Sequence, residues 1–206
     1  MGSIPPSSST MARTEYPIAL AHGHVNMMAD TVLVNASPED LRAILRNMLA
    51  SKTPGLVATF MTSTHARLRQ KPGASDANID LLLDTDTPST DLVQALKRAR
   101  MLFGSGLGFA SLEPLTAVVR STIGRHWAAD GEVSRTLAMA DADIAQAIQS
   151  CKDQLLDNGQ LVDFGAARAA YTDLLRALQD SQLDSERWGG EFAFERGFYS
   201  VLAFKM

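Results

Sequence analysis

Apolar residues recur at intervals of three and four along much of this chain, which is the spacing of one face of an α-helix. The clearest example is the segment 37–49. Ser37 is a typical helix N-cap, and Pro38 suits the first helical position. Arg42 and Arg46 lie four residues apart on another face. The apolar stripe consists of Leu41, Ile44, Leu45, Met48 and Leu49. We therefore predict an amphipathic helix that packs through this stripe.

Two more helices are expected in the first half of the chain. One starts near Thr53, and its apolar face consists of Leu56, Val57, Phe60, Met61, Thr64 and Leu68. The other starts near Thr87, and its core face consists of Leu92, Leu96, Ala99 and Phe103. The glycine-rich segment 104–108 ends it, and Pro114 is expected in the first turn of the next helix. Segment 31–34 is expected to be a short strand or an extended lead-in.

The second half of the chain predicts two long helices. Apolar residues between 132 and 157 alternate in steps of four and three, the spacing of a seam between paired helices. They are Val133, Leu137, Ala140, Ile144, Ile148, Cys151 and Leu155. A partner helix follows, with Ala167, Tyr171, Leu174 and Leu178 on its apolar face. The aromatic-rich segment 188–206 fits a helix better than a hairpin. Together these patterns predict an all-α fold, an irregular bundle of about six helices with a long antiparallel pair in the C-terminal half.

Composition agrees with a folded domain and divides the chain further. Hydrophobic residues make up 46% of the 206 residues, which supports a sizeable core. The proline- and serine-rich segment 1–23 is expected to be a flexible tail, and residues 24–206 a single helical domain. Lys and Arg outnumber Asp and Glu by 11 to 8 over residues 37–127, whereas acids lead by 13 to 7 over residues 128–206. The two halves therefore offer unlike surfaces to each other or to partners.

The sequence lacks the features that are typical of several classes of protein. The net charge of −4 gives no overall basic field for nucleic acid. Cys151 is the one cysteine, so the chain holds no disulfide and no cysteine-based zinc site. We expect neither a bound metal nor a cofactor. The sequence shows no signal peptide and no apolar run of membrane-spanning length. We therefore expect a soluble protein inside the cell, in the cytoplasm or the nucleus.

Two short motifs resemble catalytic segments of known families. Leu161-Val162-Asp163-Phe164-Gly165 resembles the metal-binding segment of protein kinases, but the other kinase motifs are missing and only 43 residues follow Asp163. Asp84-Thr85-Asp86 resembles the nucleophile motif of haloacid-dehalogenase-type phosphatases, without the alternating strands and helices of that fold. We interpret both aspartate motifs as polar segments that cap the helices after them.

The remaining candidate residues form three groups. A basic group on predicted helix surfaces suits an acidic partner surface or phosphate, and it consists of Arg42, Arg46, Lys97, Arg98 and Arg100. A possible pocket in the helical core would be lined by His126, Trp127 and Tyr171. His22 and His24 offer two metal ligands, which is too few for a site. The seam position of Cys151 indicates packing rather than nucleophilic chemistry.

The sequence leaves three hypotheses about function. The first is a non-enzymatic protein–protein interaction subunit or adaptor that binds another protein or itself, because no catalytic constellation is visible and seam-forming residues abound. The second is a small-molecule-binding protein or enzyme with a pocket in the helical core. The third is a nucleic-acid accessory factor that uses the basic stretch 67–100.

Overall fold

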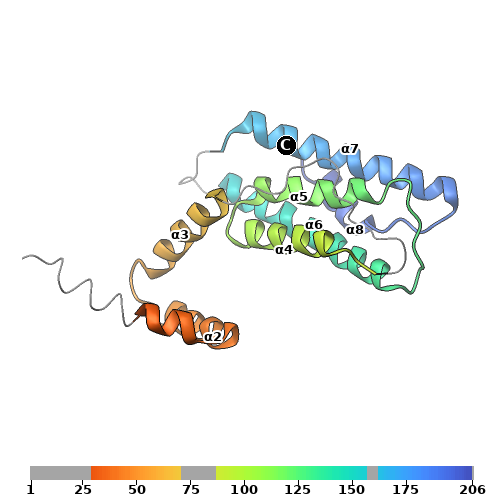
Figure 1. The fold of residues 1–206 in the computed structure, drawn as a ribbon. Coiled ribbons are helices and arrows are strands. Elements are labelled where there is room, and N and C mark those ends of the chain that lie inside the picture. Colours follow the sequence, from red (N-terminus) through yellow and green to blue (C-terminus); the bar gives the residue numbers. More distant parts are fainter. Residues whose placement is uncertain (1–28, 71–86, 157–161, 206) are drawn as a thin grey trace, which may run out of the picture. The chain divides into compact units, whose positions relative to one another are not determined.

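The computed structural model describes residues 29–70, 87–156 and 162–205, and its regular elements within these ranges are all helices (Figure 1). This confirms the predicted all-α fold. The chain divides into two compact units, residues 1–59 and residues 60–206, and each is considered by itself. The flexible tail over 1–23 and the single domain over 24–206 stay predictions. Among the described helices, none combines the length and the apolar character needed to cross a bilayer.

The described part of the first unit is built of helices, one of which begins at a cap that the sequence predicted. Residues 29–35 are helical, and the amide of Ala36 donates to the carbonyl of Val32 at 2.8 Å. The expected strand or extended lead-in at 31–34 was therefore wrong, because this stretch closes its hydrogen bonds locally. Helix α2 (Pro38–Ala50) begins as predicted, since the Ser37 hydroxyl accepts the amide of Asp40 at 3.1 Å. Helix α3 (Leu56–Gln70) starts in this unit and continues into the second.

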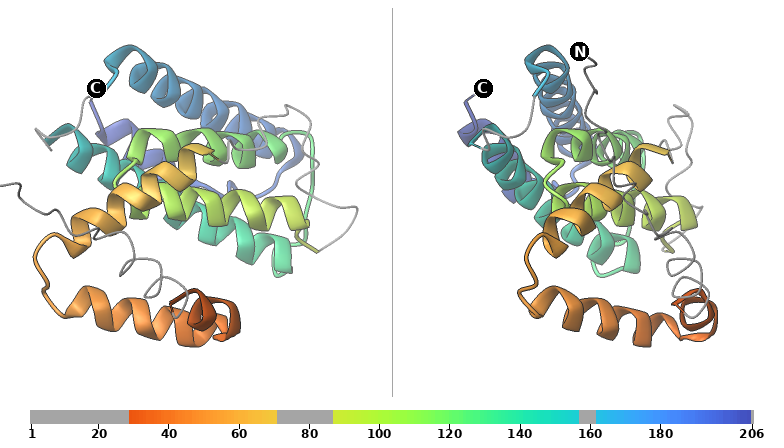
Figure 2. Two further views of the ribbon diagram at one scale, coloured as in Figure 1. Left: turned by 60° about the vertical axis from the view of Figure 1, so that its left-hand side comes forward. Right: turned by 90° about the vertical axis from the view of Figure 1, so that its left-hand side faces the viewer.

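The second unit is a helical bundle organised around one central helix. It contains α4 (Thr90–Gly104), α5 (Gly108–Ser121), α6 (Glu132–Leu156), α7 (Phe164–Trp188) and α8 (Glu195–Ala203). Helix α5 packs extensively on α4, α6 and α7, whereas α8 packs mainly on α6 (Figures 1 and 2). The residues of α5 reflect this position, because eight of its fourteen are buried. The core of the bundle therefore forms around α5.

Helix α5 starts earlier than the sequence indicated. Its first residue is Gly108, so Pro114 lies inside the helix and not in its first turn. The proline has no amide hydrogen to donate to the carbonyl of Ala110, one turn earlier in the helix, and Ala110 is exposed. The sharp corner before α5 depends on Gly106, which has a φ angle of 80° that favours glycine. Gly108, the first residue of the helix, lies in direct contact with the backbone of α6.

The two long helices are confirmed, and both lie against α5. Helices α6 and α7 run in opposite directions in the bundle (Figure 1). Each packs extensively on α5, and α6 packs also on α8 and α4, whereas α6 and α7 make few contacts with each other. The predicted seam residues of α6 are buried, from Val133 to Cys151, with Leu155 half-buried. The heptad-like spacing thus predicts correctly which residues of α6 are buried, but it does not identify the helices that pack against them.

The C-terminal segment forms a helix, as favoured over a hairpin. Phe194 precedes the first helical residue and is completely buried, and Val201 and Phe204 join it in the core. Gly197 lies against α6, where an added Cβ would come within 2.8 Å of the Ile144 side chain. The carboxylate of Asp141 on α6 accepts the amide of Gly197 at 2.6 Å. A small residue and one hydrogen bond therefore hold the start of α8 against α6.

Candidate functional site

Helix α2 carries an apolar face that is not buried. Ile44, Leu45 and Met48 are 40%, 42% and 46% exposed, and Leu41 and Leu49 are half-buried. These five residues are the α2 stripe, and no residue of α2 is buried. The prediction of an amphipathic helix is confirmed. That the stripe packs on another surface stays a prediction, because a stripe of this kind specifies a partner surface without saying which chain supplies it.

The two arginines of α2 lie along one flank of the stripe. In a helix of 3.6 residues per turn, Arg42 and Arg46 share a face beside Leu45 and Leu49. The guanidinium of Arg42 forms an exposed ion pair with Glu39 at 2.7 Å. Arg46 is exposed and makes no ion pair or hydrogen bond with the described residues. An exposed pair of this kind contributes about 0–1 kcal/mol, so both cations remain accessible to a partner.

The basic residues of α4 do not form one free surface. Lys97 is exposed and Arg98 is half-buried. The Nε of Arg100 donates to both carboxylate oxygens of Asp143 on α6, at 2.8 and 3.0 Å. Arg100 therefore holds α4 against α6, and Asp143, which is largely buried, is its counterion. The sequence missed this pair because the two residues are 43 positions apart on different helices.

The three pocket candidates do not come together. His126 is exposed, and its ring lies 4.7 Å from that of Trp188 at the end of α7. Trp127 is half-buried and meets Trp188 edge-on at 5.8 Å. The Tyr171 hydroxyl instead donates to the carbonyl of Val201 at 3.2 Å. Tyr171 and Trp188 are 17 residues apart on the same helix, about 25 Å. The candidates therefore belong to two packing clusters.

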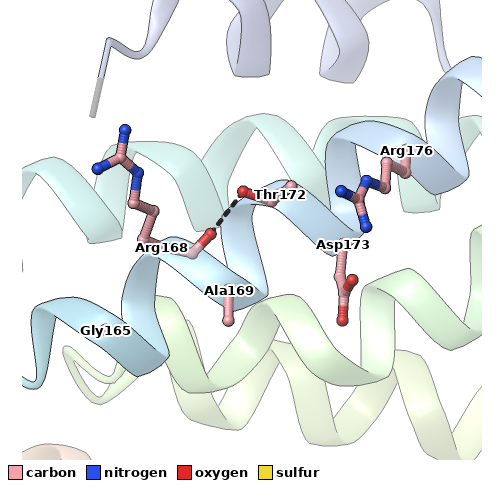
Figure 3. Close-up of a pocket in the computed structure, with 6 residues that line it drawn as sticks. All are labelled: Gly165, Arg168, Ala169, Thr172, Asp173 and Arg176. Atoms are coloured by element: carbon pink, nitrogen blue, oxygen red, sulfur yellow. Dashed lines mark hydrogen bonds between the residues drawn. The ribbon is translucent and has the colours of Figure 1, made fainter.

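A shallow depression on α7 offers no converging chemistry either. All its lining residues come from this one helix, and they are Gly165, Arg168, Ala169, Thr172, Asp173 and Arg176 (Figure 3). The Thr172 hydroxyl donates to the carbonyl of Arg168 at 2.8 Å, within the helix. The guanidinium of Arg168 points away from Asp173 and Arg176 (Figure 3). Such an arrangement does not bury a ligand or orient a reacting group.

The motif-like residues that the structure describes have structural roles. The Asp163 carboxylate accepts the amides of Gly165 and Ala166 at 2.9 and 3.1 Å, which confirms that it caps α7. Cys151 is completely buried, and desolvation raises the pKa of its thiol to about 12. Its thiolate is therefore absent near neutral pH, in agreement with packing. His22, His24, Asp84 and Asp86 lie outside the described residues.

Comparisons with known proteins add no family to this picture. No family model matches the chain, and neither a curated protein nor a solved structure shows significant similarity to it. Across residues 29–70, 87–156 and 162–205, no three His, Cys, Asp or Glu side chains gather as a metal site would require. The exposed α2 stripe with its arginine flank is therefore the candidate site with the most specific geometry.

The Asp141 carboxylate gives the docking of α8 a defined pH dependence. Burial raises the pKa of Asp141, although the amides of Gly197 and Arg196 and the charge of Arg196 oppose the rise. A group with a raised folded-state pKa stabilises the fold when protonated, and this contribution is lost as pH rises through that pKa. We expect the stability of the wild type, relative to Asp141→Asn, to be highest at or below pH 3.8 and to fall as pH increases.

Urea denaturation of the wild type and of Asp141→Asn between pH 3.5 and 7 would measure the difference in their free energies of unfolding. This range starts near the ordinary carboxyl pKa and extends to neutral pH. Asp141→Ala is the matched control, because it also removes the acceptor of the Gly197 amide. It should be less stable than Asp141→Asn at every pH. A wild-type stability that rises with pH relative to Asp141→Asn would contradict the expected sign.

Proposed function

We propose that this protein is a non-enzymatic interaction subunit that binds a partner protein through the α2 stripe. The observation that carries the proposal is the five-residue apolar face of a well-capped helix with no buried residue. Apolar side chains at helical spacing gain free energy when they leave water, by about 25 cal/mol per Å². A partner surface supplies that burial.

The length of α2 also supports a partner. The helix has 13 residues, and isolated helices shorter than about 12–15 residues are marginal in water. Its N-terminal cap and its acidic first turn favour the helical state locally. These features preorganise the apolar stripe, so that less conformational entropy is lost when a partner binds. Helix-in-groove recognition uses this arrangement of anchors at i, i+3, i+4 and i+7.

A pair of matched α2 variants tests the proposal. Leu45→Asp places a charge in the stripe, and Ala43→Asp places the same charge on the opposite, exposed face. The immobilised wild-type chain should retain a stoichiometric partner from the native extract. Leu45→Asp should weaken retention at least about tenfold because a carboxylate is costly in an apolar contact, whereas Ala43→Asp should retain the partner.

Both variants should keep the thermal unfolding midpoint of the wild type, because neither residue is buried. The proposal fails if the purified wild-type protein is monomeric and recovers no stoichiometric partner. It also fails if Leu45→Asp retains the partner as well as Ala43→Asp does.

A further inference from the structure

We infer that the element recognised by the α2 stripe is an amphipathic helix of another protein whose apolar face is flanked by acidic residues. This inference rests on the proposed function and specifies its partner. The apolar stripe alone accepts any apolar face of suitable width. The charges beside it select among such faces, because opposite charges across an interface speed association and like charges disfavour it.

The charge along α2 is unevenly placed. Its acids, Glu39 and Asp40, both lie in the first turn, where they complement the helix dipole. Asp40 also accepts the Ser37 hydroxyl at 2.7 Å, and Glu39 pairs with Arg42. Farther along the helix, the flank of the stripe presents Arg46 without a counterion among the described residues. The stripe is therefore bordered by a cationic edge that the helix itself does not neutralise.

A second copy of α2 offers this edge only the two acids of its first turn. Glu39 already pairs with Arg42 and Asp40 with the Ser37 hydroxyl, so a helix with unpaired acids along its flank neutralises the edge more fully. The flank that continues toward Ala50 carries no further acid. A helix of another protein with Glu or Asp beside its apolar residues would both bury the α2 stripe and neutralise its cationic edge. Bidentate contacts between arginine and carboxylate add geometric selectivity.

Two synthetic peptides provide the direct test on the full-length chain. Each has about 14 residues, roughly four helical turns, with leucines at i, i+3, i+4, i+7 and i+8. One carries Glu on both flanks, and the other carries Lys at the same positions. Fluorescence anisotropy at low salt should give at least about tenfold tighter binding of the Glu peptide, and added salt should reduce the difference.

Substitutions in α2 separate charge from apolar contact. Arg42→Glu combined with Arg46→Glu should reverse the preference toward the Lys peptide. Leu45→Asp should weaken binding of both peptides, whereas Ala43→Asp should leave the preference for the Glu peptide in place. Equal affinity for the two peptides, or binding of neither, overturns the inference. If the peptides bind equally or not at all but partner capture still depends on Leu45, the proposed function stands. Only the inference that the partner is an acidic helix is then wrong.

Other occupants of the stripe give different results. A dimer in sedimentation that becomes a monomer in Leu45→Asp would assign the stripe to a second copy and overturn the inference. Binding to vesicles of phosphatidylserine and phosphatidylcholine that requires Leu45 would assign it to an anionic membrane surface, with the same consequence. A monomeric wild type without vesicle binding, together with the Glu-peptide preference, supports the acidic helix.

Discussion

The Phe194→Ala variant should lose about 3–5 kcal/mol of stability. Phe194 is completely buried just before α8, and the ring of Phe192 meets it edge-on at 6.0 Å. Alanine removes most of this side chain and leaves a cavity that the surrounding helices cannot fill without moving. For a domain of this size, the thermal midpoint should fall by about 6–20 °C. Differential scanning calorimetry or circular dichroism would measure it.

Tyr199→Ala is the matched control, because Tyr199 belongs to the same aromatic segment and lies on α8. Its side chain is 63% exposed, so the thermal midpoint should change little. The comparison decides whether the C-terminal aromatic segment belongs to the core or serves as a docking surface. A Phe194→Ala protein that unfolds like the wild type would show that α8 contributes little to the bundle and would contradict the packing described above.

Gly108→Ala should cost about 2–3 kcal/mol, because α5 begins in direct contact with the backbone of α6. A Cβ at this position would lie 2.6 Å from the carbonyl carbon of Ser150 and closer still to the amide nitrogen of Cys151. Main-chain atoms inside a helix cannot move aside as a flexible side chain can. The amide of Phe109 also donates to Gln154 on α6 at 3.2 Å, and this hydrogen bond would be strained.

Gly104→Ala provides the comparison for Gly108→Ala. Gly104 is the last residue of α4, and nothing lies within 4 Å of the position of its added Cβ. Alanine has the higher helix propensity, so this variant should be neutral or more stable by up to about 1 kcal/mol. Chemical denaturation of both variants tests the assignment. A Gly108→Ala protein as stable as Gly104→Ala would mean that α5 and α6 are not in close contact there.

Features that depend on local sequence were predictable. The cap at Ser37, the cap at Asp163 and the burial of the α6 seam follow from residue type and spacing within one or two turns. The helical character of 195–203 follows from the same periodicity. These signals act over a few residues, so the sequence contains all the information that they need.

Features that depend on distant residues were not predictable. The spacing in α6 shows that a seam is buried but not that α5, α8 and α4 pack on this helix, because many apolar faces satisfy the same pattern. Arg100 was expected to be available to a partner, but Asp143 on another helix is its counterion. The close contact of Gly108 with the backbone of α6 also joins residues that are far apart in the sequence. The sequence predicts that the α2 stripe packs on a surface, but the spacing of its residues does not specify which surface.

The central position of α5 has a consequence for how the chain assembles during synthesis. Contacts of α5 with α4 and α6 join neighbours in the chain, whereas its contacts with α7 require residues made later. Domains generally fold as units during synthesis, and local contacts form fastest. Until α7 arrives, the side of α5 that faces it remains open to solvent. The interval before α7 is complete is therefore when the nascent bundle exposes its most apolar helix.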